Sequence, residues 1–174
     1  MADTGPPWNL PFPLPTDLVR DGADAIKDLA EATATGLTNA GTLRQIVRAT
    51  DDTARQTNSS SFVDASISVT ITPENANSTL LLFWTATFSN GSAGRRNESQ
   101  ITDASNTQLP GALGSTFGSG GGVIAPGIIV GFVSAGSTNP QTFKGRFRNA
   151  GSSGLVTLND NSNPGQLYAL EVGP

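Results

Sequence analysis

Residues 62–72 read Phe-Val-Asp-Ala-Ser-Ile-Ser-Val-Thr-Ile-Thr, and from Ala65 onward apolar and polar side chains alternate strictly. This period of two places Ile67 and Ile71 on one face and hydroxyl side chains on the other, which predicts a half-buried β-strand. A polar turn separates it from residues 80–88, which read Leu-Leu-Leu-Phe-Trp-Thr-Ala-Thr-Phe. This second stretch begins apolar on both faces. It therefore predicts a strand covered on two sides, by a second sheet and by either a loop or another subunit.

Strand patterns continue to the end of the chain and decide the fold class. Eight or so short strands divided by turn residues predict a mainly β chain, an antiparallel β-sandwich of the jelly-roll kind. Residues 109–117 are predicted to be irregular, and Pro126-Gly127 to mark a break or an edge. The sandwich is expected over 42–174, after an extended proline-rich arm over 1–15 and a helix with its linker over 16–41. The other strands are expected over 43–50, 95–102, 128–133, 143–148, 155–158 and 166–172.

Composition narrows the function. Only 14% of the 174 residues are charged, so solubility rests on Ser, Thr, Asn and Gly, as is common in β-rich virion or extracellular proteins. The chain has no Cys and no His, which removes thiolate metal sites, the usual general base and the commonest metal ligand. We predict a non-enzymatic chain with no metal and no cofactor. An apolar run of about 18 residues is absent and so is a secretory pattern, so no membrane partner is expected.

The arm over residues 1–15 alternates prolines with large apolar groups. Proline fixes φ and removes a backbone donor, so the segment is expected to be extended and excluded from a sheet interior. A disordered tail is one interpretation. The interpretation that we favour is an arm that docks on another protein, because a solvated tail does not need large apolar groups. The docking residues would be Trp8, Leu10, Phe12 and Leu14.

Residues 16–37 carry the helical pattern. Thr16 can cap the helix, and apolar residues recur at a spacing of three and four on a narrow stripe. Such a helix either lies on its own sandwich or self-associates in a short bundle. For the second alternative, the oligomer seam would combine the helix residues Val19, Ile26, Leu29 and Thr33 with Leu81 and Phe83 of the doubly apolar strand.

Several polar groups are candidate sites. A carboxylate pair can hydrolyse glycosides without His, but nothing in the sequence brings two of Asp51, Asp52, Asp64, Asp103 and Asp160 together. The glycine run 118–122 lacks the Lys-Ser/Thr of a phosphate-binding loop, so a hairpin loop is favoured. Residues 159–163 are predicted to form a turn rather than a calcium loop. Lys144, Arg146 and Arg148 share one strand face. They are interpreted as a solvated outer face or, alternatively, as a glycan contact, and the net charge of −4 argues against nucleic acid.

Three segments together resemble structural proteins of tailed bacteriophages of actinobacteria. Residues 13–29 resemble the N-terminal attachment segment of such proteins, 57–73 resemble the first strands of their small fibre-like domains, and 166–172 resemble the closing strand. The resemblance implies a virion structural protein, assembled in the host cytoplasm: a short trimeric fibre, a minor tail protein, or a head fibre or capsid decoration. Its partners would be copies of itself and other virion proteins.

The resemblance also implies sandwiches packed side by side about a three-fold axis. Such packing would account for Leu81, Phe83 and Ile129 being apolar where a sheet face should be wet. The alternative from another class is a glycan-binding, host-adhesion module on a phage tail.

Overall fold

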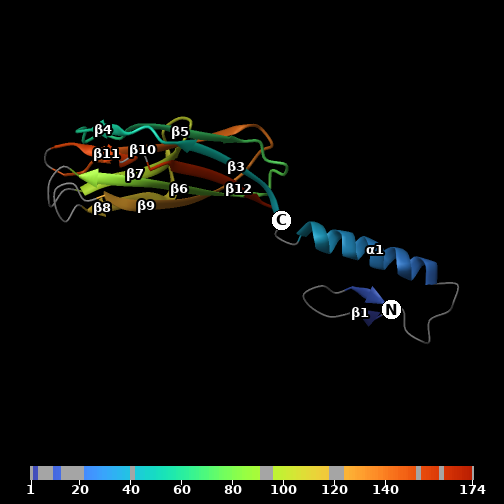
Figure 1. Cartoon of the computed structure of the whole chain (residues 1–174). Coiled ribbons are helices and arrows are strands. Elements are labelled where there is room, and N and C mark those ends of the chain that lie inside the picture. Colours follow the sequence, from blue (N-terminus) through green and yellow to red (C-terminus); the bar gives the residue numbers. More distant parts are fainter. Residues whose placement is uncertain are drawn as a thin grey trace. The chain divides into compact units, whose positions relative to one another are not determined.

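A computed structural model describes residues 2–3, 10–12, 22–39, 42–90, 96–117, 124–151, 154–160 and 163–173. The chain forms two compact units. Residues 1–42 with 173–174 make the smaller one, and residues 43–172 make the larger one (Figure 1).

The larger unit contains two antiparallel sheets, which confirms the predicted sandwich. One sheet has the strand order β5-β10-β7-β8, and the other places β6 between β9 on one edge and β12 and then β11 on the other. β12 pairs in turn with β3, and β11 with β4. The strands are β3 (Leu43–Asp51), β4 (Arg55–Thr57), β5 (Val63–Ile71), β6 (Thr79–Asn90), β7 (Arg96–Asp103), β8 (Gln108–Phe117), β9 (Ile124–Ser134), β10 (Gln141–Asn149), β11 (Val156–Leu158) and β12 (Gly165–Val172).

The pairing is nested in the manner of a jelly roll. β7 pairs with β8, β6 with β9, β5 with β10, and β3 with β12, so strands progressively farther apart in sequence lie side by side. Successive pairs alternate between the two sheets, which produces the double-sheet roll expected from the strand pattern.

Side chains that point inward from both sheets form one core. The indole of Trp84 contacts the ring of Phe88 edge-on, with centroids 6.1 Å apart. Gly145 of β10 provides the space for this indole, because a Cβ there would lie 2.9 Å from the Trp84 ring. The largest fully buried apolar side chains are Trp84, Phe88, Phe147, Ile71, Leu80, Leu82, Ile101, Leu158 and Leu167.

One strand prediction was wrong, and another held in one of its two alternatives. Residues 109–117, expected to be irregular, belong to β8, whereas Pro126-Gly127 lies in an edge strand, β9, without breaking it. Both β8 and β9 are edge strands, where proline costs no ladder hydrogen bond. Gly127 also lies against the Phe88 ring, because a Cβ at this position would be 2.6 Å from the ring. Glycine is therefore required here by the close contact and not by a turn.

The smaller unit contains β1 (Ala2–Asp3), β2 (Pro11–Phe12) and the helix α1 (Gly22–Asn39). β1 pairs antiparallel with β2. The helix continues two residues beyond the predicted Leu37, and its predicted beginning over 16–21 lies outside the described residues. Within the described ranges, no helix has the length and apolar character needed to span a bilayer.

Candidate assembly surfaces

The outer face of the β3-β12-β6-β9 sheet carries two apolar rows that cross all four strands. One row consists of Phe132, Leu81, Leu170 and Ile46, in the order β9, β6, β12, β3. The next row consists of Val130, Phe83, Tyr168 and Arg48. In these two rows Arg48 is the sole charged residue. The sequence therefore builds an apolar surface on the side of the sheet that faces away from the core.

The side chains on β9 are the most exposed part of this surface. Ile128 is 69% exposed, Phe132 58% and Val130 46%, whereas Leu81 and Phe83 on the neighbouring β6 are half-buried between strands. We call the outward-facing residues Ile128, Val130, Phe132, Leu81, Phe83, Leu170 and Ile46 the outer apolar face. A sandwich in isolation leaves this face in contact with water.

Sequence reasoning placed part of this face correctly and missed the rest. Leu81 and Phe83 do point outward and lie beside β9. Ile129, expected on the same face, is only 2% exposed and belongs to the core, so that expectation was wrong. Residues 128–133 are apolar on both faces of the strand, so this pattern does not show which face points into the core. The glycines could have revealed it, because Gly127 and Gly131 share the inward side with Ile129, and a Cβ at Gly131 would lie 2.8 Å from Ala112.

The helix α1 presents a second apolar surface. Ile26 is 69% exposed, and Leu29 and Leu37 are also exposed, whereas Ala25 is buried. Ile26, Leu29 and Thr33 recur at a spacing of three and four residues, so they share one stripe of the helix. Lys27 and Glu31 form an exposed ion pair beside the stripe, at 3.5 Å.

One predicted docking residue lies against the helix. Leu10 lines a hollow with Thr33, Gly36 and Leu37, so the arm contacts the C-terminal half of α1. Trp8, Leu14 and Val19 lie outside the described residues, as does the side chain of Phe12. Their docking and seam roles stay predictions.

The outer face of the opposite sheet is polar, and its cations have partners within the chain. Lys144 donates to Oδ1 of Asn106 at 2.8 Å, and Arg146 donates to the carbonyl of Phe62 at 2.6 Å. Arg148 donates to the buried carboxylate of Glu98, with its guanidinium 4.5 Å from the ring centroid of Phe62. The three cations do share one face of β10, as predicted. A glycan contact there stays a prediction.

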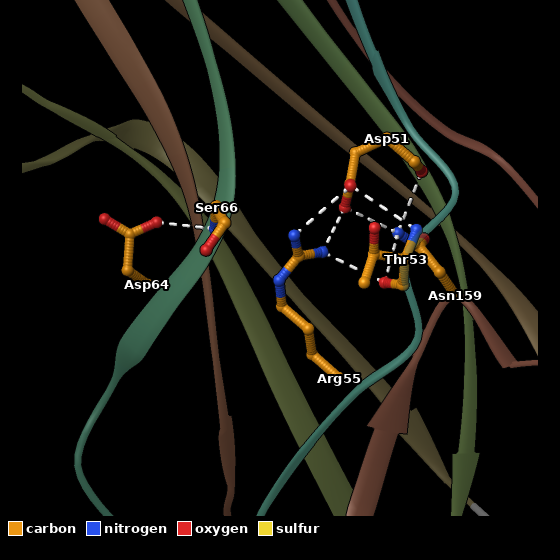
Figure 2. Close-up of polar contacts among 6 residues, drawn as sticks. All are labelled: Asp51, Thr53, Arg55, Asp64, Ser66 and Asn159. Atoms are coloured by element: carbon orange, nitrogen blue, oxygen red, sulfur yellow. Dashed lines mark hydrogen bonds and ion pairs between the residues drawn. The ribbon is translucent and has the colours of Figure 1, made fainter.

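The carboxylates considered for hydrolysis serve local structure. Asp51 forms an ion pair with Arg55 and accepts a hydrogen bond from Nδ2 of Asn159, as Figure 2 shows. Asp64 accepts from the backbone N–H of Ser66, whose φ is 55° (Figure 2). Asp103 accepts from the N–H of Thr107, and Asp160 from the hydroxyl of Ser89. No group of three potential metal ligands gathers anywhere in the described part of the chain.

Glu171 is a buried carboxylate that the sequence did not reveal. It is fully enclosed at the inner side of β12 and accepts hydrogen bonds from Gln45 at 2.6 Å and from the N–H groups of Glu74 and Asn75 at 3.0 and 3.1 Å. Burial by itself raises the pKa of Glu171, but these hydrogen bonds outweigh burial and lower the pKa from 4.5 to about 2. The group therefore fastens the turn before β6 to the closing strand.

No protein-family model and no curated protein matches this chain. Among solved structures, it is similar to VP2 of the infectious bursal disease virus subviral particle, with a TM-score of 0.41 and 15% identity, over 76% of this chain and 38% of that chain. This chain thus spans less than two-fifths of that capsid protein.

Two bacteriophage proteins are also similar. The tripod of the Tuc2009 baseplate matches with a TM-score of 0.37 and 17% identity, over 92% of this chain and 96% of that chain. The enzymatically active domain of tailspike protein 4 of bacteriophage CBA120 matches with a TM-score of 0.30 and 10% identity, over 72% and 19%. All three TM-scores lie below 0.5, so no conclusion about function follows from them.

Proposed function

We propose that this chain is a non-enzymatic structural component of a bacteriophage virion, a short trimeric fibre or appendage. Residues 1–15 dock on another virion protein, the helix forms a stalk and the sandwich forms a knob. A head fibre, a capsid decoration and a minor tail protein are the locations compatible with this role.

The exposed stripe on α1 carries the proposal. A helix that is not buried in a self-associating interface gains nothing from exposed Ile26, Leu29 and Leu37 in water. Parallel packing of such stripes from several copies would remove them from solvent. The spacing of Ile26, Leu29 and Thr33 suits a short bundle, in which helices interlock through positions three and four residues apart.

The polar groups of the sandwich support a structural role. The carboxylates that glycoside hydrolysis would need instead form ion pairs or accept hydrogen bonds within turns, as described for Asp51, Asp64 and Asp103. The resemblance of residues 13–29 and 57–73 to phage structural proteins supports the virion location.

The mass of the full-length chain in solution tests self-assembly. Light scattering after size exclusion, at several concentrations, should give three times 17.8 kDa. Ile26→Asp should lower the mass, because a charge in an apolar seam must be desolvated. Thr35→Asp is the matched control, because residue 35 lies half a revolution away from residue 26 on the helix. A wild-type chain that stays at 17.8 kDa at every concentration would contradict the proposal.

Purified phage particles test the docking role of the arm. Quantitative mass spectrometry of particles should find the full-length chain, and a version lacking residues 1–15 should be lost from them. Full occupancy by the shortened chain would remove docking by the arm from the proposal.

A further inference from the structure

We infer that the arm restrains self-assembly of the chain. In the free chain, residues 10–12 lie on one flank of the α1 stripe, where a neighbouring helix would have to pack. Docking of the arm on another virion protein would then free the helix for assembly. The inference rests on the self-assembly proposed above and adds what controls it.

The described part of the arm lies against its own helix. β2 contacts α1, and β2 is itself paired with β1. Leu10 is half-buried and lines a hollow on the helix, whose other walls are Thr33, Gly36 and Leu37. Since Leu10 is one of the predicted docking residues, the helix already covers part of the surface that another protein would need.

The contact lies on one flank of the stripe. At about 100° of rotation per residue, Thr33 and Leu37 lie within about 20° of Ile26 around the helix axis and mark the middle of the stripe. Gly36 and Ala25 lie about 80° and 100° away from Ile26, both on the same side. The chain covers this flank, because Ala25 is 4% exposed and Gly36 is half-buried, whereas Ile26 is 69% exposed.

A helix bundle needs the flank that the arm occupies. In a bundle of three, every helix contacts two neighbours, one on each flank of its stripe, with helix axes about 8–10 Å apart. That spacing leaves no room for a segment of chain between two helices. The arm and a second neighbouring helix therefore exclude each other from α1.

The covalent connection favours the arm at low protein concentration. Residues 13–21 join Phe12 to Gly22, so the arm meets the helix at an effective concentration on the order of millimolar, whereas a neighbouring copy is present only at its bulk concentration. An arm that covers the helix in about nine-tenths of the chains raises the dissociation constant of the oligomer roughly tenfold. By reciprocity, assembly frees the arm, so assembly and docking favour each other.

Leu10→Ser in the full-length chain tests the restraint, because it removes the apolar contact without changing the helix or the net charge. We expect the dissociation constant of the oligomer to fall roughly tenfold in light scattering across a dilution series. Leu155→Ser is the matched control, since it makes the same change at a side chain that is 46% exposed on the sandwich. A dissociation constant that rises or stays unchanged for Leu10→Ser would overturn the inference.

The outcomes separate this inference from the proposed function. If the wild-type chain assembles and Leu10→Ser assembles no more tightly, the proposed function stands and the restraint by the arm is wrong. If neither chain assembles at any concentration, the proposed function and this inference fail together. Tighter assembly of Leu10→Ser, with Leu155→Ser at the wild-type value, supports the inference.

Locking the arm provides an independent readout, because the chain has no cysteine of its own. In the variant Leu10→Cys/Gly36→Cys, a short bismaleimide should join the arm to the helix within one chain. The locked chain should stay monomeric at concentrations at which the untreated variant assembles. Leu10→Cys/Asp24→Cys is the control pair and should not be joined, because residue 24 lies about 160° around the helix from residue 26. Equal assembly of the locked and untreated chains would overturn the inference, since the arm and a neighbouring helix would then share α1.

Discussion

Glu171 shows how one buried charge makes stability depend on pH. Its pKa is lowered in the folded chain, so its contribution is present above pH 4.5 and is lost as the pH falls from 4.5 toward 2. The difference in pKa corresponds to a stabilisation on the order of 3 kcal/mol at neutral pH.

Glu171→Gln should remove this dependence. Urea unfolding at a series of pH values should show the wild-type chain more stable than the variant at pH 7, with the difference shrinking between about pH 5 and pH 2. The comparison cancels the titration of the other carboxylates. A difference that stays constant over this range would contradict the role assigned to the hydrogen bonds from Gln45, Glu74 and Asn75.

Gly145 is required by contacts and not by its backbone conformation. A Cβ there would lie 2.9 Å from both Ile67 and the Trp84 ring. Gly145→Ala should therefore cost about 1–3 kcal/mol of unfolding free energy, the usual range for overpacking. Gly22→Ala is the control, because no atom lies within 4 Å of its added Cβ. Equal stability of the Gly145→Ala and wild-type sandwiches in urea unfolding would show that the core yields more easily than the geometry indicates.

At the scale of elements, Asn159, which directly follows β11, is bonded to Asp51 at the end of β3. Its φ is 54°, and Nδ2 donates to the carbonyl of Asp51 at 2.9 Å and to the Asp51 carboxylate at 3.1 Å (Figure 2). The turn between β3 and β4 is thereby fastened to the connection between β11 and β12. The gap between β3 and β4 therefore lies beside the gap between β11 and β12.

Two substitutions separate the roles of Asn159. Asn159→Gly keeps the backbone conformation and loses the hydrogen bonds, which should cost about 1–2 kcal/mol. Asn159→Ala loses the same bonds and adds left-handed strain, which should cost about 1 kcal/mol more. Urea unfolding of both variants measures the order. An alanine variant as stable as the glycine variant would exclude a contribution from left-handed backbone strain.

The sequence predicted some elements well because their patterns are unambiguous. The strict alternation of β5 placed Ile67, Val69 and Ile71 in the core, as the structure confirms. β8 was missed because Pro110, Gly111 and Gly114 oppose strand formation by local propensity. Tertiary packing decides there instead, since β8 is an edge strand and a Cβ at Gly114 would lie 3.1 Å from Ile129.

The candidate surfaces were predictable only in part. Leu81 and Phe83 could be identified because they lie in a strand that is apolar on both faces. The exposed row on β9 was missed because residues 128–133 are apolar on both faces, and only Gly127 and Gly131 distinguish the inward face. The partners of Arg146 and Arg148 were equally hidden, since both contact residues 60–62, more than 80 positions away in sequence.

At the scale of the whole molecule, charge and apolar area predict how salt affects the oligomer. The effect should be opposite to the one seen in an assembly held together by ion pairs. Residues 1–43 carry six acidic and two basic residues, so the N-terminal segments of neighbouring copies repel. Raising the salt concentration from about 0.05 M to 0.5 M screens this repulsion and leaves apolar contacts intact. The oligomer should therefore become tighter, as measured by light scattering across a dilution series. Dissociation at high salt would indicate ion pairs between copies.

The nested pairing also means that the sandwich begins and ends at the same place, where Leu43 of β3 lies opposite Val172 of β12. A protein engineer can use this closure. The segment 43–172 should tolerate insertion into an exposed turn of a host protein, because its two ends already meet at the spacing that a turn offers. Conversely, a peptide meant for display at the opposite end of the sandwich belongs in the connection between β4 and β5, since one appended after β12 would emerge beside the first strand.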